Sequence, residues 1–421
     1  MKYLQRGGLL FLLSFVLFSC GQKSKELNSK ETTRLPNFGS VKLEEVFKNT
    51  DNRIDGEGEL EQLITQYYDR VWEKGDLWGG FLIAKGDKIL FERYRGYAQD
   101  NEESKIDPGT ALHVASVSKS LTAMTTLKLV EAGKLSLDQE VASLFPKFPY
   151  QGITVRMLLN QRSGLPKYEY FIERIDQSSP QLAKKFLTNQ DVLDLLIDHK
   201  PDLARKPDTG FMYCNTNYAL LALIIEKVTS TPFPQAMKQM VFTPLEMEDS
   251  YIFQEKDTLS AAKSFFARGP SVHPYDRLDL IYGDKNLYTT PRDLFNFSRA
   301  MYSEDFLKKE LMEQVFIPYS QERPGVNNYG LGFRMKVFDE NSKLTYHNGW
   351  WHGSNSVFAH LLQSKVTIIA IGNKYSQRVY SALALSALFE NFPYEREKLN
   401  KELGSSADSL QKTVEVRASV K

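Results

Sequence analysis

The stretch Ala115-Ser-Val-Ser-Lys-Ser-Leu-Thr-Ala-Met-Thr-Thr-Leu-Lys-Leu-Val-Glu-Ala-Gly133 decides how the rest of the chain is interpreted. Its apolar residues recur at helical spacing and predict one amphipathic helix that ends at the glycine: Val117, Leu121, Met124, Leu127 and Val130. Ser116 and Lys119 stand three positions apart at the start of this helix, so both side chains lie on one face. The free N–H groups and partial positive charge of a helix N-terminus favour a deprotonated serine and an amine that can lose its proton.

Two further Ser-x-x-Lys strings show how specific this motif is. They lie at Ser260–Lys263 and Ser409–Lys412. Only the string at Ser116 opens a well-formed amphipathic helix, and Ser409 belongs to the charged C-terminal segment. The motif at Ser116 therefore needs support from other parts of the chain.

The string Tyr213-Cys214-Asn215 supplies the second group of candidates. A phenol near a lysine ammonium gives up its proton more easily, so Tyr213 can accept the serine proton and later protonate a leaving group. Asn215 can donate to a substrate carbonyl and accept from the lysine at the same time. We expect Cys214 to be a small packed residue, because no paired histidine motif accompanies it.

The third candidate string is His347-Asn348-Gly349, on a predicted strand. A glycine after the polar pair lets a substrate lie close along the strand edge. The backbone N–H of Trp350 can then bind an oxyanion beside the N–H of Ser116. We expect Trp350 and Trp351 to form part of the pocket wall.

Taken in this order, the three motifs resemble those of the serine β-lactamase and penicillin-binding protein superfamily. The combination of Tyr-x-Asn with His-x-Gly is similar to the branch of class C β-lactamases, DD-peptidases and esterases. Surrounding strings are also similar to that family: residues 129–138, 153–159, 163–166, 283–294 and 329–332. The resemblance covers residues 60–392 and leaves out both ends of the chain.

The resemblance implies a role for each motif residue. Ser116 is the nucleophile that forms the acyl-enzyme, and Lys119 and Tyr213 share proton transfer, with the choice of base left open. His347 either contacts the substrate or tunes Tyr213. The implied substrate-binding and oxyanion positions are Asn215, His347, Asn348, Gly349 and Trp350.

One departure from the family pattern affects the expected substrate. Class C β-lactamases usually carry Lys-Thr-Gly at the third motif, where this chain has His347-Asn348-Gly349. A histidine with a pKa near ~6.5 is mostly neutral at pH 7 and binds a carboxylate less firmly than a lysine does. Penicillins and peptidoglycan stem peptides carry such a carboxylate, and simple esters do not. Efficient β-lactamase activity is therefore not the first expectation.

Extended segments at both ends of the chain flank a mainly helical middle. Strands are predicted at 80–84, 89–94, 330–338, 344–348, 354–361 and 366–372, and helices at 60–72, 116–132, 190–199, 218–229, 234–241, 291–302 and 378–392. This order predicts an α+β fold: an antiparallel sheet built from both chain ends, flanked by helices, with a mainly helical insert at about 115–325. We expect one hydrolase domain over residues 59–392.

The N-terminal segment predicts export from the cytosol. Residues 1–19 combine a basic start with an apolar run too short for a membrane helix of ~20 residues, which is typical of a signal peptide. The run ends at Cys20 and resembles a bacterial lipobox, so we expect Cys20 to carry lipid. An ordinary secretory signal with a chance cysteine is the alternative. Residues 20–58 are expected to be a tether and residues 393–421 a loose tail.

Composition excludes several other classes of protein. With 53 basic and 52 acidic residues, the chain has no basic field for nucleic acid. Two cysteines cannot make a disulfide scaffold. The six histidines show no metal-ligand spacing and no nucleotide motif is present, so we expect neither metal nor cofactor.

Three functions are consistent with these sequence features. The first is a serine hydrolase of the bacterial cell envelope, anchored by the lipid on Cys20, that cleaves an amide, ester or lactam through an acyl-enzyme on Ser116. Its substrate is a small molecule or a peptide, such as a peptidoglycan stem peptide. The second is a lipid-anchored protein that binds peptidoglycan or β-lactams without turnover, and the third is a structural lipoprotein. The oligomeric state stays open.

Overall fold

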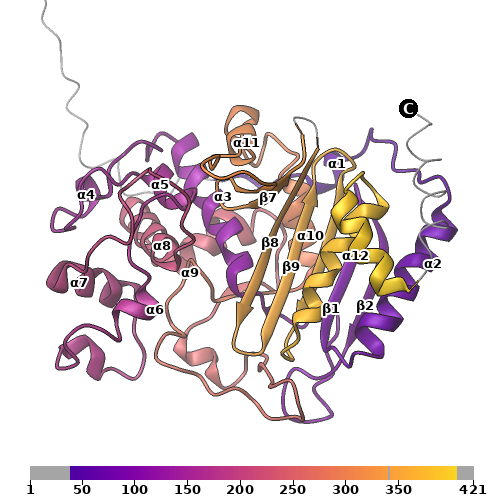
Figure 1. Ribbon diagram of the computed structural model, residues 1–421, viewed down its shortest axis with the longest axis horizontal. Helices are drawn as coiled ribbons and strands as arrows, with labels where there is room; N and C mark the ends of the chain where they lie inside the picture. The colour runs from indigo at the N-terminus through magenta and orange to yellow at the C-terminus, as the bar shows by residue number, and fades with distance from the viewer. Residues whose placement is uncertain (1–37, 340–341, 405–421) are drawn as a thin grey trace, which may run out of the picture. The chain divides into compact units, whose positions relative to one another are not determined.

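The computed structural model describes residues 38–339 and 342–404, which are organised around a seven-stranded antiparallel sheet. The strand order is β2-β1-β10-β9-β8-β7-β6, so strands from both ends of the chain lie side by side (Figure 1). The bounds are β1 Gly79–Lys85, β2 Lys88–Arg95, β6 Asn327–Tyr329, β7 Arg334–Val337, β8 Lys343–Trp351, β9 Ser354–Leu361 and β10 Val366–Gly372. The predicted sheet of two chain ends is confirmed.

The two central strands explain the apolar runs in the sequence. Every residue of β9 and of β10 is buried. In β10, Ile368 faces Ile83 of β1 on one side and Ala359 of β9 on the other. Strands covered on both faces need apolar side chains in both directions, so β10 shows little polar alternation.

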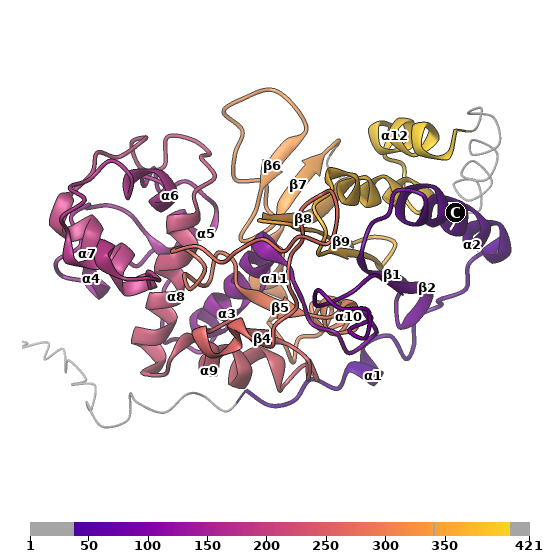
Figure 2. The same cartoon turned by 90° about the horizontal axis from the view of Figure 1, so that it is seen from below.

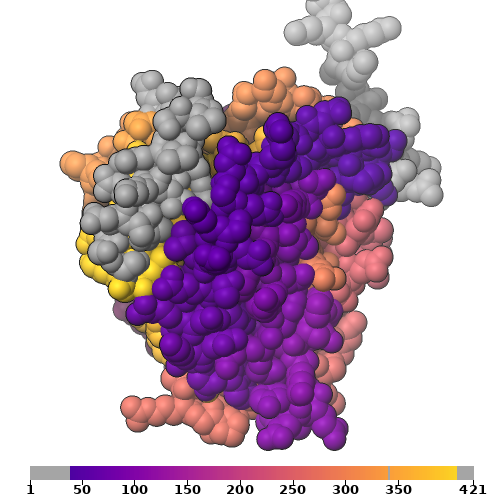
Figure 3. All heavy atoms as spheres, turned by 90° about the vertical axis from the view of Figure 1, so that its right-hand side faces the viewer, coloured from indigo at the N-terminus to yellow at the C-terminus, as the bar shows by residue number. Residues whose placement is uncertain are grey.

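One face of the sheet carries helices from the two chain ends. Their bounds are α2 Glu57–Tyr68, the π-helical turn η1 Asp69–Glu73, the 3₁₀ helix η6 Gln377–Leu388 and α12 Pro393–Leu403. Tyr68 stacks on Trp72 with ring centroids 5.9 Å apart, and both rings contact Phe81 of β1. Figure 3, seen from the right-hand side of Figure 1, shows indigo N-terminal residues over much of the surface and yellow C-terminal residues at one edge.

The helical insert lies on the opposite face and beside the sheet (Figure 2). Helix α1 Leu43–Val46 precedes the insert. The helices of the insert are η2 Ala115–Val117, α3 Ser118–Glu131, α4 Val141–Leu144, α5 Val155–Leu159, α6 Tyr168–Phe171, η3 Pro180–Ala183, α7 Asn189–His199, α8 Asn215–Thr229, α9 Phe233–Met237, η4 Lys238–Phe242, η5 Glu255–Thr258, α10 Pro291–Ala300 and α11 Lys309–Val315. A small second sheet has the order β3-β5-β4, with β3 Leu112–His113, β4 Tyr251–Ile252 and β5 Leu287–Thr289. The α10 helix packs on β1 and β10.

Helix α3 is the central helix of the insert and differs from its prediction in one respect. All residues from Ser118 to Leu129 are buried, so the helix has no solvent face along most of its length. Its polar side chains bond to backbone carbonyls instead: Ser120 to Gly332, and Thr122 to Gly283, both at 2.8 Å. An amphipathic stripe was visible in the sequence, but these buried polar contacts depend on segments far along the chain.

Parts of both predicted flexible ends pack on the body. Residues 393–403, predicted as part of the tail, form α12, in which Leu399 and Leu403 are buried in the core and Glu395 pairs with Lys336 of β7. In the predicted tether, Val41 and Leu43 are buried against the body. A short helix with few, widely spaced apolar residues gives little periodic signal, and its burial depends on a partner surface. Cys20 and residues 405–421 lie outside the described residues.

Within residues 38–339 and 342–404, no helix has the length and apolar character needed to cross a bilayer.

The burial of α12 makes a stability prediction. Leu399 is 1% exposed, so Leu399→Ala should lower the free energy of unfolding by about 2–5 kcal/mol through lost transfer energy and a cavity. Urea denaturation measures this loss. The control Lys401→Ala removes an exposed ion pair with Glu397 and should change the free energy of unfolding little. Equal stability of the Leu399 variant and the wild type would restore the loose-tail interpretation.

Candidate active site

Ser116 lies in the short turn between β3 and α3. This turn is the 3₁₀ segment η2, and it begins with Ala115 in the left-handed region at φ 46°. A non-glycine residue held at positive φ costs about 1–3 kcal/mol and needs support from its surroundings. Part of that support comes from Ser356 of β9, whose hydroxyl donates to the carbonyl of Val114 at 2.7 Å.

Lys119 lies one turn further along, with its side chain fully buried. Its Nζ donates to Ser116 Oγ at 3.0 Å and to the backbone carbonyl of Asp284 at 2.7 Å. The same atom is 5.1 Å from the ring centroid of Tyr213. The structure thus brings the three predicted catalytic residues into one cluster, as expected for groups that exchange a proton.

Tyr213 and Asn215 are held by the start of α8. Gln161 fixes the backbone before the helix, because its side-chain oxygen accepts from the N–H of Cys214 at 2.9 Å. Asn215 is the first residue of α8, and its Nδ2 donates to Glu169 of α6. Its Oδ1 is buried and has no hydrogen-bond partner among the described residues.

Cys214 is packed away from the site, as predicted. The thiol is fully buried and contacts the carbonyl of Leu165 at 3.3 Å. Burial raises the pKa of Cys214 to about 11, so the side chain stays a neutral thiol at physiological pH. Its role is structural.

His347 occupies a different position from a substrate ligand. It is fully buried on β8, its Nδ1 donates to the carbonyl of Asn348 at 2.8 Å, and its Nε2 accepts from the Tyr329 hydroxyl at 3.2 Å. Burial, followed by repulsion from Arg334 and Lys119, lowers the pKa of His347 well below its usual value. The neutral ring lies beside Tyr213, with ring centroids 6.2 Å apart. Of the two roles implied for His347, this position favours the one that acts on Tyr213.

Gly349 allows β8 to pass directly over the nucleophile turn. A Cβ atom at Gly349 would lie 2.1 Å from the carbonyl oxygen of Val114, 2.3 Å from Ser356 Oγ and 3.1 Å from the nitrogen of Ser116. No side chain fits in this gap. The glycine therefore places the strand backbone against the N–H of Ser116, next to Trp350, where the oxyanion hole is predicted.

A cavity of about 910 Å³ opens above these groups. Most of the predicted site residues line it: Ser116, Tyr213, Asn215, Asn348, Gly349 and Trp350. Lys119 and His347 lie beneath the cavity rather than on its wall. Trp350 and Tyr170 stand at its mouth, 63% and 58% exposed, and Trp351 also lines it, in agreement with the predicted pocket wall.

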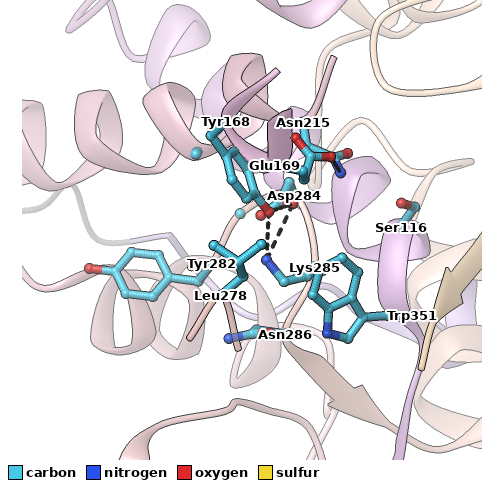
Figure 4. Close-up of polar contacts among 12 residues, drawn as sticks. Ser116, Tyr168, Glu169, Asn215, Leu278, Tyr282, Asp284, Lys285, Asn286 and Trp351 are labelled. Carbon is cyan, nitrogen blue, oxygen red and sulfur yellow. Dashed lines mark hydrogen bonds and ion pairs between the residues drawn. The ribbon is translucent and has the colours of Figure 1, made fainter. Parts of the chain in front are cut away.

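Two charged residues of the cavity were not predicted. Arg334 of β7 lies 4.5 Å from the ring centroid of Tyr213, and among the described residues its guanidinium has no hydrogen-bond or ion-pair partner. Glu169 accepts from Asn215 with one carboxylate oxygen, and burial raises the pKa of its carboxyl group. Figure 4 shows Glu169 and Asn215 ending close together. Neither residue belongs to one of the three motifs. Arg334 lies in the strand predicted at 330–338, just after the family-like string at 329–332.

Asp276, Asp279 and His352 form a cluster at the cavity wall, which Asp276 and His352 line, and their ligand atoms lie within 4.8 Å of one another. His352 Nε2 lies 3.0 Å from Asp279 Oδ1, which also accepts from the Trp351 indole at 2.6 Å. Burial opposes the charged ring, but Asp279 outweighs it and raises the pKa of His352. These contacts describe an ion pair between His352 and Asp279.

Comparison with known proteins identifies the family. Residues 60–388 match the family model described as Beta-lactamase. The chain belongs to the beta-lactamase family. Penicillin-binding protein 4* of Bacillus subtilis is 30% identical over 338 residues, which cover 76% of this chain and 73% of the relative.

Solved structures of the family have the same fold. A penicillin-binding protein from Bacillus halodurans matches 78% of this chain and 99% of its own with a TM-score of 0.66 and 26% identity. D-amino acid amidase from Ochrobactrum anthropi SV3 matches 82% of this chain and 99% of its own with a TM-score of 0.62 at 20% identity. These matches confirm the predicted resemblance and the α+β fold. Family membership supports the coarse prediction of a serine hydrolase that acts on amide or lactam bonds.

The close approach at Gly349 predicts the effect of one methyl group. Gly349→Ala should destabilise the fold by about 1–3 kcal/mol through overpacking. Displacement of the strand should also slow acylation of Ser116 by a fluorophosphonate at least ~10-fold. Gly58→Ala in α2 is the matched control, because its methyl group would meet open space. Normal acylation of the Gly349 variant would contradict this account of the strand.

The neutral state of His347 predicts a pH dependence of stability. Below about pH 6.5 the unfolded chain protonates this histidine while the folded protein does not, so stability falls as the pH falls. His347→Gln should flatten the slope of unfolding free energy between pH 6.5 and 5 by up to about 1.4 kcal/mol per pH unit. Urea denaturation at several pH values measures the slope. An unchanged slope would mean that the folded protein protonates His347.

Proposed function

We propose that this protein is an exported serine amidohydrolase that forms an acyl-enzyme on Ser116 and cleaves a peptide or lactam amide whose substrate carries a carboxylate. One observation carries the proposal: Lys119 Nζ is 3.0 Å from Ser116 Oγ, which supports the reaction. Arg334 lines the same cavity and supports the kind of substrate.

The reaction uses the contacts around Ser116. Its Oγ attacks the amide carbonyl as its proton passes to the Lys119–Tyr213 pair. The oxyanion accepts from the N–H groups of Ser116 and Trp350. The pair then protonates the leaving nitrogen, the C–N bond breaks, and an ester remains on Ser116. Water attacks this ester and gives a proton to the same pair. The bond from the carbonyl carbon to Ser116 Oγ then breaks, the pair returns the proton to Oγ, and the carboxylic acid leaves.

Arg334 supports a substrate with a carboxylate. Because His347 is neutral and its ring nitrogens are both engaged, it cannot supply the positive charge that lysine provides in class C β-lactamases. Arginine stays charged at every physiological pH and binds a carboxylate with two parallel N–H groups. A peptide C-terminus and a penicillin both present such a group, so an amide substrate is favoured over a simple ester.

The N-terminal sequence supports a place in the cell envelope. Residues 1–19 are proposed to be the signal peptide, and Cys20 the lipidated first residue of the mature protein. A lipid at this end would hold the catalytic body near the membrane, within reach of cell-wall peptides. Both features lie outside the described residues and remain predictions from sequence.

The acyl-enzyme is tested by intact-mass measurement after exposure to a fluorophosphonate, a penicillin and a p-nitrophenyl ester. Wild-type protein should gain the mass of the acyl group, and Ser116→Ala should gain none. Turnover of a peptide is then followed by release of its C-terminal residue. No adduct with any reagent would reject the hydrolase, and an adduct without peptide turnover would favour the binding protein.

The role of Arg334 is tested with two peptides that end in D-Ala-D-Ala and differ only in a free or amidated C-terminus. Wild-type protein should prefer the free acid. Arg334→Gln should lower kcat/KM for that peptide about 10- to 100-fold, which corresponds to a lost charged hydrogen bond of about 1.5–3 kcal/mol, and should change the amidated peptide little. Arg93→Gln on β2 is the control. Equal losses on both peptides would reject carboxylate recognition by Arg334.

A further inference from the structure

Three buried polar side chains lie behind Lys119 and take no part in the reaction described above. Asp284, Lys285 and Tyr168, here named the Asp284 cluster, are 0%, 2% and 0% exposed. The Tyr168 hydroxyl donates to Asp284 Oδ2 at 2.7 Å and accepts from Lys285 Nζ at 2.6 Å. Lys285 Nζ also lies 3.7 Å from the same carboxylate oxygen (Figure 4).

The cluster is joined to Lys119 through the backbone. The carbonyl of Asp284 accepts from Lys119 Nζ at 2.7 Å, which is shorter than the contact of that atom with Ser116. The loop that carries this carbonyl is fastened to α3 on both sides: Thr122 donates to the carbonyl of Gly283 at 2.8 Å, and Ser118 Oγ accepts from the N–H of Leu287 at 3.1 Å. A shift of this loop would therefore move the acceptor that orients Lys119.

The cluster also carries charge in a buried region. Burial raises the pKa of Tyr168 well above its usual value, with Asp284 adding to the effect, so the phenol stays neutral and links a carboxylate to an ammonium. Polar and charged groups approach Lys119 from every packed element: Tyr213, Asn215 and Tyr218 from α8 and the residues before it, Glu169 from α6, Asp284 and Lys285 from the loop before β5, Arg334 from β7 and His347 from β8.

Asp284 and Lys285 bring opposite charges into the buried region behind Lys119. A carboxylate favours the protonated form of a neighbouring group, and an ammonium opposes it. These charges also act on Glu169. Besides burial, Asp284 raises the pKa of this carboxyl group, while Lys285 and Lys119 lower it.

We propose that Asp284 and Lys285 are positioning residues that hold the carbonyl acceptor of Lys119 and balance the charge around it, so that Lys119 can exchange a proton with Ser116. The proposal rests on the acyl-enzyme function proposed above. It assigns a role in the reaction to a buried ion pair that belongs to no catalytic motif of the chain.

The test measures the rate of Ser116 acylation by a neutral fluorophosphonate between pH 5 and 9. Asp284→Asn removes a negative charge from the buried region and should move the acid limb of the pH–rate profile down by about 1 pH unit. Lys285→Met removes the opposing charge and should move it up by a similar amount. The double variant should return the limb close to its wild-type position, because both charges are gone.

Two controls separate charge from folding. Tyr168→Phe removes the hydroxyl bridge without changing any charge, so it should lower the maximal rate and leave the limb in place. Lys128→Met removes another buried lysine of α3, which donates to the carbonyl of Phe306, and should leave the limb unchanged. Thermal melting establishes that each variant is folded, and Lys285→Arg should restore the wild-type limb if Lys285→Met is unstable.

Each outcome separates the two proposals. Opposite shifts that cancel in the double variant support the role of the Asp284 cluster. The role is overturned if the acid limbs do not move. It is also overturned if both limbs move in the same direction and the double variant acylates more slowly than either single variant. Both results leave the proposed acyl-enzyme intact. No acylation of the wild-type protein at any pH overturns the proposed function itself.

Discussion

The burial of the Lys119 ammonium group is the constraint on which the rest of the site depends. A charge removed from water must find acceptors and neighbours that replace its hydration. Lys119 finds them in Ser116 Oγ and the Asp284 carbonyl, with two aromatic rings nearby. The rings come from the start of α8 and the carbonyl from the loop before β5, so these distant segments must fold together before the lysine can be accommodated.

The sheet forms the other half of the site, and the position of its strand β8 is tightly constrained. β8 must pass close enough to η2 that only glycine fits at position 349, and the partners that it meets there are backbone and a hydroxyl from β9. The helix start therefore fixes the nucleophile, and the strand fixes the backbone opposite to it. The cavity between them gains its two new charges, Arg334 and Glu169, from neighbouring elements of each side.

The sequence was informative where the signal is local. The spacing of Ser116 and Lys119, the hairpin of β1 and β2, and the buried runs of β9 and β10 all follow from short-range periodicity, and the motif order indicated the family. Arg334, Glu169 and Asp284 could not be found in this way, because their roles arise from contacts between segments up to 165 positions apart. The short helix α12 was missed for a related reason: its few apolar residues become a core face only against the helices beside it.

The pairing of β1 with β10 has a consequence for the timing of synthesis. Gly79 lies opposite Gly372, so the partner of the first strand leaves the ribosome almost three hundred residues later. At about 5–20 residues per second, β1 and β2 wait for roughly 15–60 s with one edge unpaired. For the export proposed above this delay would be useful, because the domain cannot close before its last strands are made and the chain stays open for passage through a membrane.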